Sequence, residues 1–207
     1  MLINANEAIR TVVHGDALPW VASPQGGVQR RMLSRVGGEV ALATSIVRYD
    51  KGASFAPHTH ELGEEYVVLD GVFQDERGDH PAGHYVRNPP GSSHTPRADQ
   101  GATIFVKLRH MHPSDCAQVH TDMPNGPGTH SLHSDEREWV GVVHSAQGQV
   151  WQDTFAYGAE LLVLQGHLLE GDDALRPWSW MRLPAGSSLN ASVVQGPAKV
   201  WLKRYVQ

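Results

Sequence analysis

Residues 52–94 dominate the interpretation of this chain, and they read GASFAPHTHELGEEYVVLDGVFQDERGDHPAGHYVRNPPGSSH. His58 and His60 are separated by one residue, and Glu64 follows four residues after His60. Turn-forming residues and a further histidine then recur at fixed intervals: Gly52, Gly71, Gly83, Pro89, Gly91 and His94. A His-x-His pair alone carries little information, because the chain has 13 histidines and His110 and His112 form a second pair. The surrounding pattern makes the first pair specific.

These spacings resemble the two motifs of the cupin superfamily. They read Gly52-x5-His58-x-His60-x3-Glu64-x6-Gly71 and Gly83-x5-Pro89-x-Gly91-x2-His94. The second motif of the superfamily ends in asparagine, where this chain has Ala98, at a position that is not a ligand in the family. More narrowly, residues 64–96 look like the cupin domain of ChrR-type anti-sigma factors. The resemblance implies a jelly-roll barrel with four metal ligands: His58, His60, Glu64 and His94.

A repeat at an offset of 95 residues indicates two related domains. Residues 65–71 (EYVVLDG) return as 160–166 (ELLVLQG), and residues 85–93 (YVRNPPGSS) return as 180–188 (WMRLPAGSS). Glycine and proline keep their places, as a repeated set of turns requires. With the resemblance, the repeat predicts an all-β fold of two tandem cupin (jelly-roll) barrels with very little helix. The expected limits are 1–112 for the first barrel, 113–134 for a linker rich in His, Pro and Gly, and 135–207 for the second barrel.

The second copy lacks the expected ligands. The four ligand positions, taken 95 residues further on, are occupied by Asp153, Phe155, Ala159 and Leu189. We therefore expect one divalent ion per chain, in the first barrel. We expect the second barrel to fold on an apolar core with these members: Phe155, Leu161, Val163 and Leu189.

The residue types in the first copy support the same four ligands. His58 and His60 are two apart on an expected strand, so both imidazoles point to one face and can reach a single ion. Three imidazoles and a carboxylate suit Zn or Fe(II), with Mn or Ni as alternatives, whereas Ca and Mg sites use mostly oxygen. Glu65 is a competing carboxylate, but it must face away from Glu64 on a strand. It also recurs as Glu160 in the copy without ligands, which favours a structural role.

Composition restricts the classes of function. The chain has 207 residues, of which 40% are hydrophobic and 19% charged, and its net charge is -5. A chain of this charge without a Lys/Arg block is poorly suited to nucleic acid. No apolar run reaches the roughly 18 residues of a membrane span, and the first residues lack a signal-peptide pattern. We therefore expect a cytoplasmic protein with no membrane or nucleic-acid partner.

Short β-rich apolar stretches bounded by Gly, Pro, Asp or Ser predict strands. They cover residues 40–49, 66–69, 103–108, 139–143, 161–164 and 200–205. Only residues 4–14 hint at a helix, because Asn4 or Asn6 could cap a short turn before Gly15. The lone Cys116 permits no internal disulfide.

Other polar residues carry weaker signals. His80 and His84 could line the mouth of the site, although surface histidines on a hairpin are the more ordinary interpretation. Tyr85 and Arg87 have counterparts in the second copy, which favours a structural role for both. A second zinc site could form in the linker region, but the spacing of its residues matches no ligand pattern, which favours a solvated segment. Its candidates are His110, His112, Cys116, His120, Asp122, His130 and His133.

The resemblance leaves three functions open. The first is a non-haem metal dioxygenase, or a related lyase or isomerase, acting on a small chelating diketone or hydroxyketone. Its catalytic residues are not identified, although Tyr66, Glu76 and Arg109 are candidates for an acid or base. The second is a ChrR-like anti-sigma or oxidative-stress sensor protein, for which the expected N-terminal zinc domain that grips the sigma factor has no counterpart before Gly52. The third is a binding or storage module without catalysis, in which the metal only ties strands together. The partners considered for the protein are a small-molecule ligand or substrate and a second copy in a homodimer.

Overall fold

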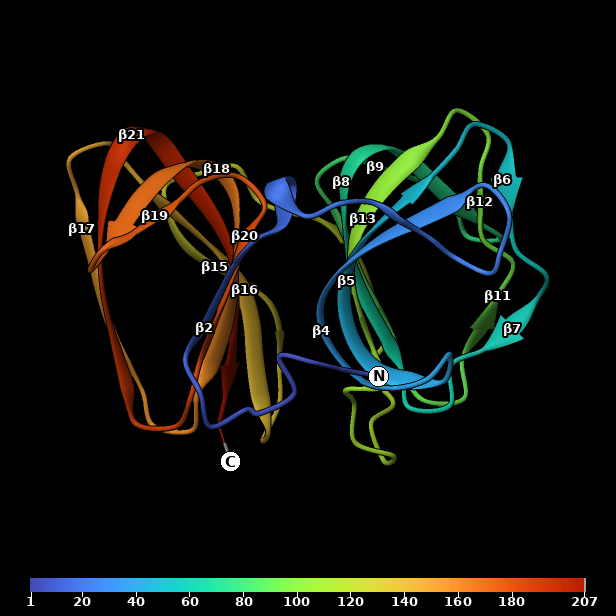
Figure 1. The fold of residues 1–207 in the computed structure, drawn as a ribbon, viewed down its shortest axis with the longest axis horizontal. Coiled ribbons are helices and arrows are strands. Elements are labelled where there is room, and N and C mark those ends of the chain that lie inside the picture. Colours follow the sequence, from blue (N-terminus) through green and yellow to red (C-terminus); the bar gives the residue numbers. More distant parts are fainter. Residues whose placement is uncertain (207) are drawn as a thin grey trace. The chain divides into compact units, whose positions relative to one another are not determined.

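The computed structural model describes residues 1–206, whose regular secondary structure is almost entirely β-strand (Figure 1). Over this range the only helix is a three-residue 3-10 turn, η1 (Gly15–Ala17). No helix within 1–206 is long and apolar enough to cross a membrane. The chain divides into two compact units. Unit 1 comprises residues 1–5 and 19–123, and unit 2 comprises residues 6–18 and the chain from 124 onward.

Unit 1 contains an antiparallel sheet in the order β1-β4-β5-β13-β8-β10-β14 and a separate pair, β7 and β11. Of the short strands, β3 pairs with β4, β9 and β12 pair with β8, and β6 pairs with β12. Figure 1 shows β7 and β11 side by side. The strands of this unit are β1 (Leu2–Ile3), β3 (Val21–Ala22), β4 (Val28–Gly37), β5 (Ala41–Tyr49), β6 (Ala53–Ser54), β7 (His58–Thr59), β8 (Glu64–Asp75), β9 (Gly78–Pro81), β10 (His84–Asn88), β11 (Ser93–His94), β12 (Arg97–Ala98), β13 (Ala102–Leu108) and β14 (Val119–Asp122). The core lies between these strands and includes Tyr66, Phe73, Val86, Ile104 and Val106.

Unit 2 contains one antiparallel sheet in the order β15-β16-β21-β18-β20-β2, with β17 paired to β21 and β19 to β18. Its strands are β2 (Thr11–His14), β15 (Gly128–Ser134), β16 (Glu138–Ser145), β17 (Val150–Phe155), β18 (Ala159–Glu170), β19 (Asp173–Leu175), β20 (Ser179–Leu183) and β21 (Ser187–Tyr205). The four expected core residues of this region, Phe155, Leu161, Val163 and Leu189, are all buried in its apolar core.

All six predicted apolar stretches overlap strands, but the expectation of helix in residues 4–14 is wrong. Residues 11–14 form β2, which pairs with β20 from Thr11↔Arg182 to His14↔Ser179. This strand therefore belongs to unit 2, although the sequence assigned it to the first barrel. The expected linker, residues 113–134, carries β14 in unit 1 and β15 in unit 2. For β2 and β14 a partner strand distant in sequence supplies the hydrogen bonds, so no local signal marks these two segments. β15 pairs with the strand that follows it, β16.

The 95-residue repeat reappears as strand register. In unit 1 His94 pairs with His58, and Asn88 pairs with Glu64. The residues 95 positions further on pair in the same way, since Asp153 faces Leu189 and Ala159 faces Leu183. The two copies thus share backbone pairing as well as turn residues, while the side chains at the ligand positions differ.

Gly71 and Gly166, which are equivalent in the repeat, permit a close approach of two backbones. Gly71 has φ +71°, and a Cβ added to it would lie 2.3 Å from the carbonyl oxygen of Gly101. Gly166 has φ +77°, and its Cβ would lie 2.5 Å from the carbonyl oxygen of Pro197. Glycine is required at both positions for two reasons. Only glycine adopts this positive φ without strain, and a Cβ would collide with a backbone oxygen that cannot move aside as a side chain could.

Gly71→Ala is expected to lower the free energy of unfolding by about 1–3 kcal/mol, because it places a Cβ at positive φ and against a carbonyl oxygen. Urea unfolding followed by tryptophan fluorescence measures the loss. Gly38→Ala is the matched control: a Cβ there meets nothing within 4 Å, so the change should stay within about 0.5 kcal/mol. Equal effects of the two substitutions would contradict this explanation of the repeated glycine.

Candidate metal centre

The strand pair β7–β11 and the start of β8 bring the four expected ligands together. His94 lies opposite His58 in the antiparallel pair. His60 follows β7 and is held by two backbone bonds: its N–H donates to Ser92 O at 2.9 Å, and its carbonyl accepts from Gly91 N at 2.8 Å. Gly91 has φ +82°, which allows the turn before β11 to close without strain.

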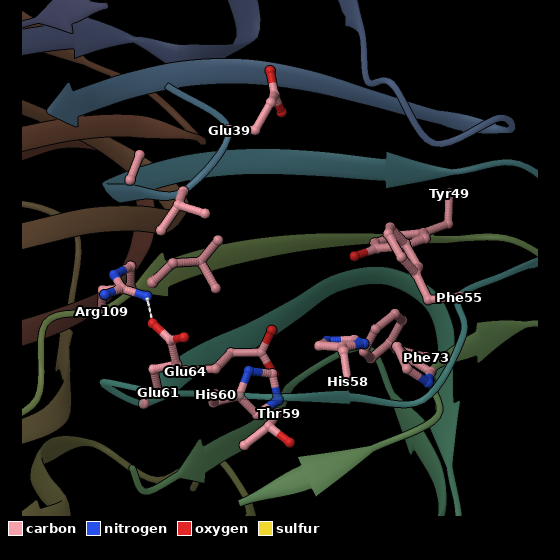
Figure 2. Close-up of a pocket in the computed structure, with 15 residues that line it drawn as sticks. Glu39, Tyr49, Phe55, His58, Thr59, His60, Glu61, Glu64, Phe73 and Arg109 are labelled. Carbon is pink, nitrogen blue, oxygen red and sulfur yellow. Dashed lines mark hydrogen bonds and ion pairs between the residues drawn. The ribbon is translucent and has the colours of Figure 1, made fainter. Parts of the chain in front are cut away.

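The three histidine side chains converge, and the Glu64 carboxylate lies beside two of them. Each of His58, His60 and His94 offers a ring nitrogen, and these nitrogens lie within 4.8 Å of one another. Oε2 of Glu64 lies 3.4 Å from Nε2 of His60 and 3.5 Å from Nε2 of His94. His60, Glu64 and His94 are buried, whereas His58 is half-buried. Figure 2 shows His58, His60 and Glu64 around the floor of a pocket.

The buried nitrogens of this group fit a metal ion. Within residues 1–206, Nε2 of His60 and Nε2 of His94 are both buried without a hydrogen-bond partner. Burying a polar atom without a partner is costly, and a cation coordinated between the two nitrogens and Glu64 would remove that cost. Three imidazoles and one carboxylate are donors that Zn, Fe(II), Mn and Ni accept.

The groups behind the ligands orient them and set their protonation. Asn88 Nδ2 donates to Glu64 Oε2 at 3.2 Å, and Nδ1 of His94 lies 3.4 Å from Asp75 Oδ2. Burial lowers the pKa of His60, so its ring is neutral at neutral pH and has a lone pair available. Burial also acts to lower the pKa of His94, but the hydrogen bond with Asp75 and the negative charge of Glu64 outweigh it and raise the net pKa.

Glu65 faces a different environment from Glu64. Its Oε1 accepts a hydrogen bond from the Tyr85 hydroxyl at 2.6 Å and lies 3.9 Å from Nη1 of Arg87. Its counterpart Glu160 accepts hydrogen bonds from Trp180 Nε1 at 3.0 Å and from another hydroxyl, that of Tyr205, at 2.6 Å. The carboxylate therefore has the same kind of buried polar partners in both units, as expected for a structural residue.

A pocket of about 370 Å³ opens above His58, His60 and Glu64. Figure 2 shows its aromatic residues on one side and its ion pair on the other. The aromatic wall consists of Tyr49, Phe55 and Phe73, with ring centroids 5.8 Å apart for Tyr49 and Phe55 and 4.9 Å apart for Tyr49 and Phe73. At the opposite side Nη1 of Arg109 donates to Oε2 of Glu61 at 2.5 Å.

Several weaker expectations have different outcomes. Arg109 lines the pocket, whereas Glu76 is exposed and is not among the lining residues. The Tyr66 hydroxyl is buried without a hydrogen-bond partner in the described chain. The expectation that His80 is a surface residue is wrong: it is 3% exposed, because its ring packs beside Tyr66 and bonds to Asp75.

The histidines of the expected linker separate between the two units. In unit 1, Nε2 of His110 lies 3.2 Å from the carbonyl oxygen of Ala43, while His120 approaches His80 and His84. In unit 2, Nε2 of His130 lies 3.0 Å from the carbonyl oxygen of Gly126. Cys116 is exposed. Asp75, Tyr49 and Phe55 were not selected from the sequence, since no spacing distinguishes them from other strand residues and only long-range contacts bring them to the site.

Comparisons with known proteins agree with the fold and the motif. The sequence model of the ChrR cupin-like domain matches residues 8–112. No curated protein matches the chain significantly. Solved structures that resemble it include a candidate dioxygenase from Nostoc punctiforme, with TM-score 0.77 and 14% identity over 96% of this chain and 82% of that chain.

Two further structures extend the comparison. The bacterial pirin YhhW from Escherichia coli, in complex with nickel(II), has TM-score 0.73 and 11% identity over 95% of this chain and 97% of that chain. A cupin 2 conserved barrel domain protein from Leptotrichia buccalis has TM-score 0.62 and 11% identity over 94% and 96%. These identities show a shared fold alone. Because the family model covers half of the sequence, the chain belongs to the ChrR cupin-like domain family of the cupin superfamily.

Proposed function

We propose that this protein is a metal-dependent dioxygenase acting on a small chelating diketone or hydroxyketone. In this proposal the two units are tandem cupin barrels, and the first holds one divalent ion through His58, His60, Glu64 and His94. Fe(II) is the ion of the active enzyme, and Zn can occupy the same ligands. The observation that carries the proposal is the pocket, whose floor contains His58, His60 and Glu64. Nε2 of His60 is buried there without a hydrogen-bond partner among residues 1–206. The matching strand registers of the two units support the tandem arrangement.

The proposed ligands leave room for substrate on the pocket side. A bound metal would supply Lewis acidity and, in the case of iron, redox chemistry with dioxygen. His94 is held from behind by Asp75, and such outer partners fix the orientation of a ligating ring. The Glu64 carboxylate would offset part of the positive charge of the bound ion, and Asn88 positions this carboxylate through a hydrogen bond.

The pocket walls suit a small, partly aromatic substrate. Tyr49, Phe55 and Phe73 offer ring faces and edges next to His58, whose ring centroid lies 5.9 Å from that of Phe55. Such a wall binds an apolar group and excludes water from the reacting atoms. Burial raises the pKa of Tyr49 well above its usual value, so its phenol keeps its proton and can donate a hydrogen bond to a substrate oxygen. Arg109 lies at the opposite side of the pocket, where its charge is paired with that of Glu61.

A sensor function is the second candidate, and membership of the ChrR cupin-like domain family is the observation that favours it. In that case the same ligands would bind Zn, and an oxidant would alter the site without turnover. A sigma factor is the partner that this candidate suggests. We expect no stable 1:1 complex with a sigma factor on gel filtration, and co-elution would support the sensor over the enzyme.

His94→Ala should abolish binding of the ion in this site while the protein remains folded. An ion present at about 100 times its Kd stabilises the native state by about 2.7 kcal/mol, so the loaded wild-type protein should melt roughly 5–10 °C above the variant. Elemental analysis and thermal melts with and without metal measure the two effects. Global unfolding of the metal-free variant would contradict this prediction and would show that unit 1 needs the ion to fold.

Glu64→Gln and Glu65→Gln form a matched pair, because they are the same change at adjacent positions. Glu64→Gln should weaken metal binding at this site, since it removes a ligating charge. Glu65→Gln should leave the metal content unchanged and instead lower stability by about 1–3 kcal/mol, because the buried bonds to Tyr85 and Arg87 lose their charge. Metal loss in the Glu65 variant alone would identify it as the ligand.

The dioxygenase proposal predicts oxygen uptake by protein loaded anaerobically with Fe(II) and mixed with a diketone or hydroxyketone. Zn should inhibit by occupying the same ligands without redox chemistry. An oxygen electrode and product analysis measure the reaction, and His60→Ala is the inactive control. Absence of uptake across a panel of aryl and alkyl ketones, with Fe(II) bound in the site, would overturn the enzymatic proposal.

A further inference from the structure

A second group of histidines lies in unit 1 outside the pocket. His80 comes from β9, His84 begins β10, and His120 lies in β14. Each ring offers a nitrogen, and these three nitrogens lie within 4.8 Å of one another. This is the same closeness that joins the three histidines of the first site, although the two groups share no residue.

Strand register explains why these three residues meet. In the β10–β14 pair His84 lies opposite Asp122, and Val86 lies opposite His120. Because alternate residues share a face, His84 and His120 are diagonal neighbours on one side of the sheet. The ring of His80 stacks on that of His84 with centroids 5.0 Å apart, and lies 5.3 Å from that of His120.

Two of the rings are held by carboxylates at one nitrogen. Nε2 of His80 lies 3.0 Å from Asp75 Oδ1, and Nδ1 of His84 lies 2.8 Å from Asp122 Oδ1. A carboxylate acceptor keeps the proton of a neutral imidazole on the nitrogen that faces it. The lone pair is then on Nδ1 of His80 and on Nε2 of His84. A carboxylate behind a histidine is the usual outer support of a metal ligand.

Two buried nitrogens of the group have no hydrogen-bond partner in the part of the chain that the structure describes: Nε2 of His84 and Nδ1 of His120. Burial and the neighbouring His80 lower the pKa of His120 to about 4, so this ring is neutral at neutral pH. Nε2 of His120 lies 3.1 Å from the amide nitrogen of Gln118. Rotation of that amide would present its oxygen to Nε2 and leave the lone pair on Nδ1. The cost would be the present bonds of Gln118 to Asn88 and Arg77.

The charges around the group favour a cation. The carboxylates of Asp75 and Asp122 hold two of the rings, and the guanidinium of Arg77 acts on His120. The Asp122 side chain is 83% exposed, so one supporting carboxylate of the group lies at the protein surface. Three imidazoles suit a borderline divalent ion and leave a fourth position for water, whereas Ca and Mg would require oxygen ligands.

We propose that His80, His84 and His120 bind a second divalent transition-metal ion, of the Zn, Co or Ni type. The expected stoichiometry of one ion per chain is thereby revised to two. The site lies on the β9–β10 hairpin and the edge strand β14, so it involves unit 1 alone. It shares no ligand with the pocket site, although Asp75 contacts one histidine of each group.

Titration of metal-free, tag-free protein with Zn or Co(II) tests the second site. The wild-type protein should bind two equivalents. His58→Ala with His60→Ala removes the first site without touching Asp75, and this double variant should bind one. Adding His120→Ala to the double variant should abolish binding. His112→Ala is the matched control, because His112 is an exposed histidine of the same segment. This variant should still bind two equivalents of the metal.

Asp122→Asn provides a version of the test that does not depend on removing a buried ring. Asp122 is exposed, so the fold should be unaffected, while loss of the outer carboxylate should weaken the second ion by about 10–100-fold. If the wild type binds one ion and His120→Ala still binds it, the second site is overturned. If the wild type binds one ion, His120→Ala loses it and the double variant keeps it, the second site is supported and the metal site proposed for the pocket is contradicted.

Discussion

The buried carboxylate of Glu64 is the constraint around which unit 1 is arranged. It begins β8, a strand paired with β10 on one side and with β13 on the other. A carboxylate at 7% exposure is stable only when donors or cations surround it. Asn88 supplies one donor from the neighbouring strand. The ring nitrogens of His60, which follows β7, and of His94 in β11 lie 3.4 and 3.5 Å from the carboxylate, and a cation held between them would balance its charge. Such a cation would tie the short strand pair to β8.

The pleat of β8 separates this charge from the next one along the chain. Glu65 points away from Glu64 into bonds with Tyr85 and Arg87. In unit 2 the inner position has become Ala159, which is fully buried in the apolar core, while the outer glutamate remains as Glu160. The inward-facing position at the start of this strand is therefore polar in unit 1, where histidines surround it, and apolar in unit 2, where an apolar core surrounds it. The outer glutamate bridges neighbouring strands in both units and belongs to the framework.

The sequence predicted what depends on local periodicity and on the repeat. Strand locations, the inward Glu64 and the apolar core of the second copy all follow from alternation and turn residues. It could not predict the burial of His80, because that depends on Asp75 and on packing across strands. Nor could it predict that His120 joins a hairpin distant from it in sequence. The strand that carries His120 has four residues and gains its hydrogen bonds from β10 alone, so its own residues carry no recognisable pattern.

Asp75 connects the two histidine groups. Its Oδ2 lies 3.4 Å from His94 of the pocket group, and its Oδ1 lies 3.0 Å from His80 of the second. Its desolvation is outweighed by the hydrogen bonds of these two histidines and of the Arg77 backbone N–H, which hold the pKa of the carboxyl far below its usual range. Asp75 therefore stays charged, and each of its oxygens fixes the tautomer of one ring. Because a single buried carboxylate supports one histidine from each group, the electrostatics of either group depend on the proton or ion held by the other.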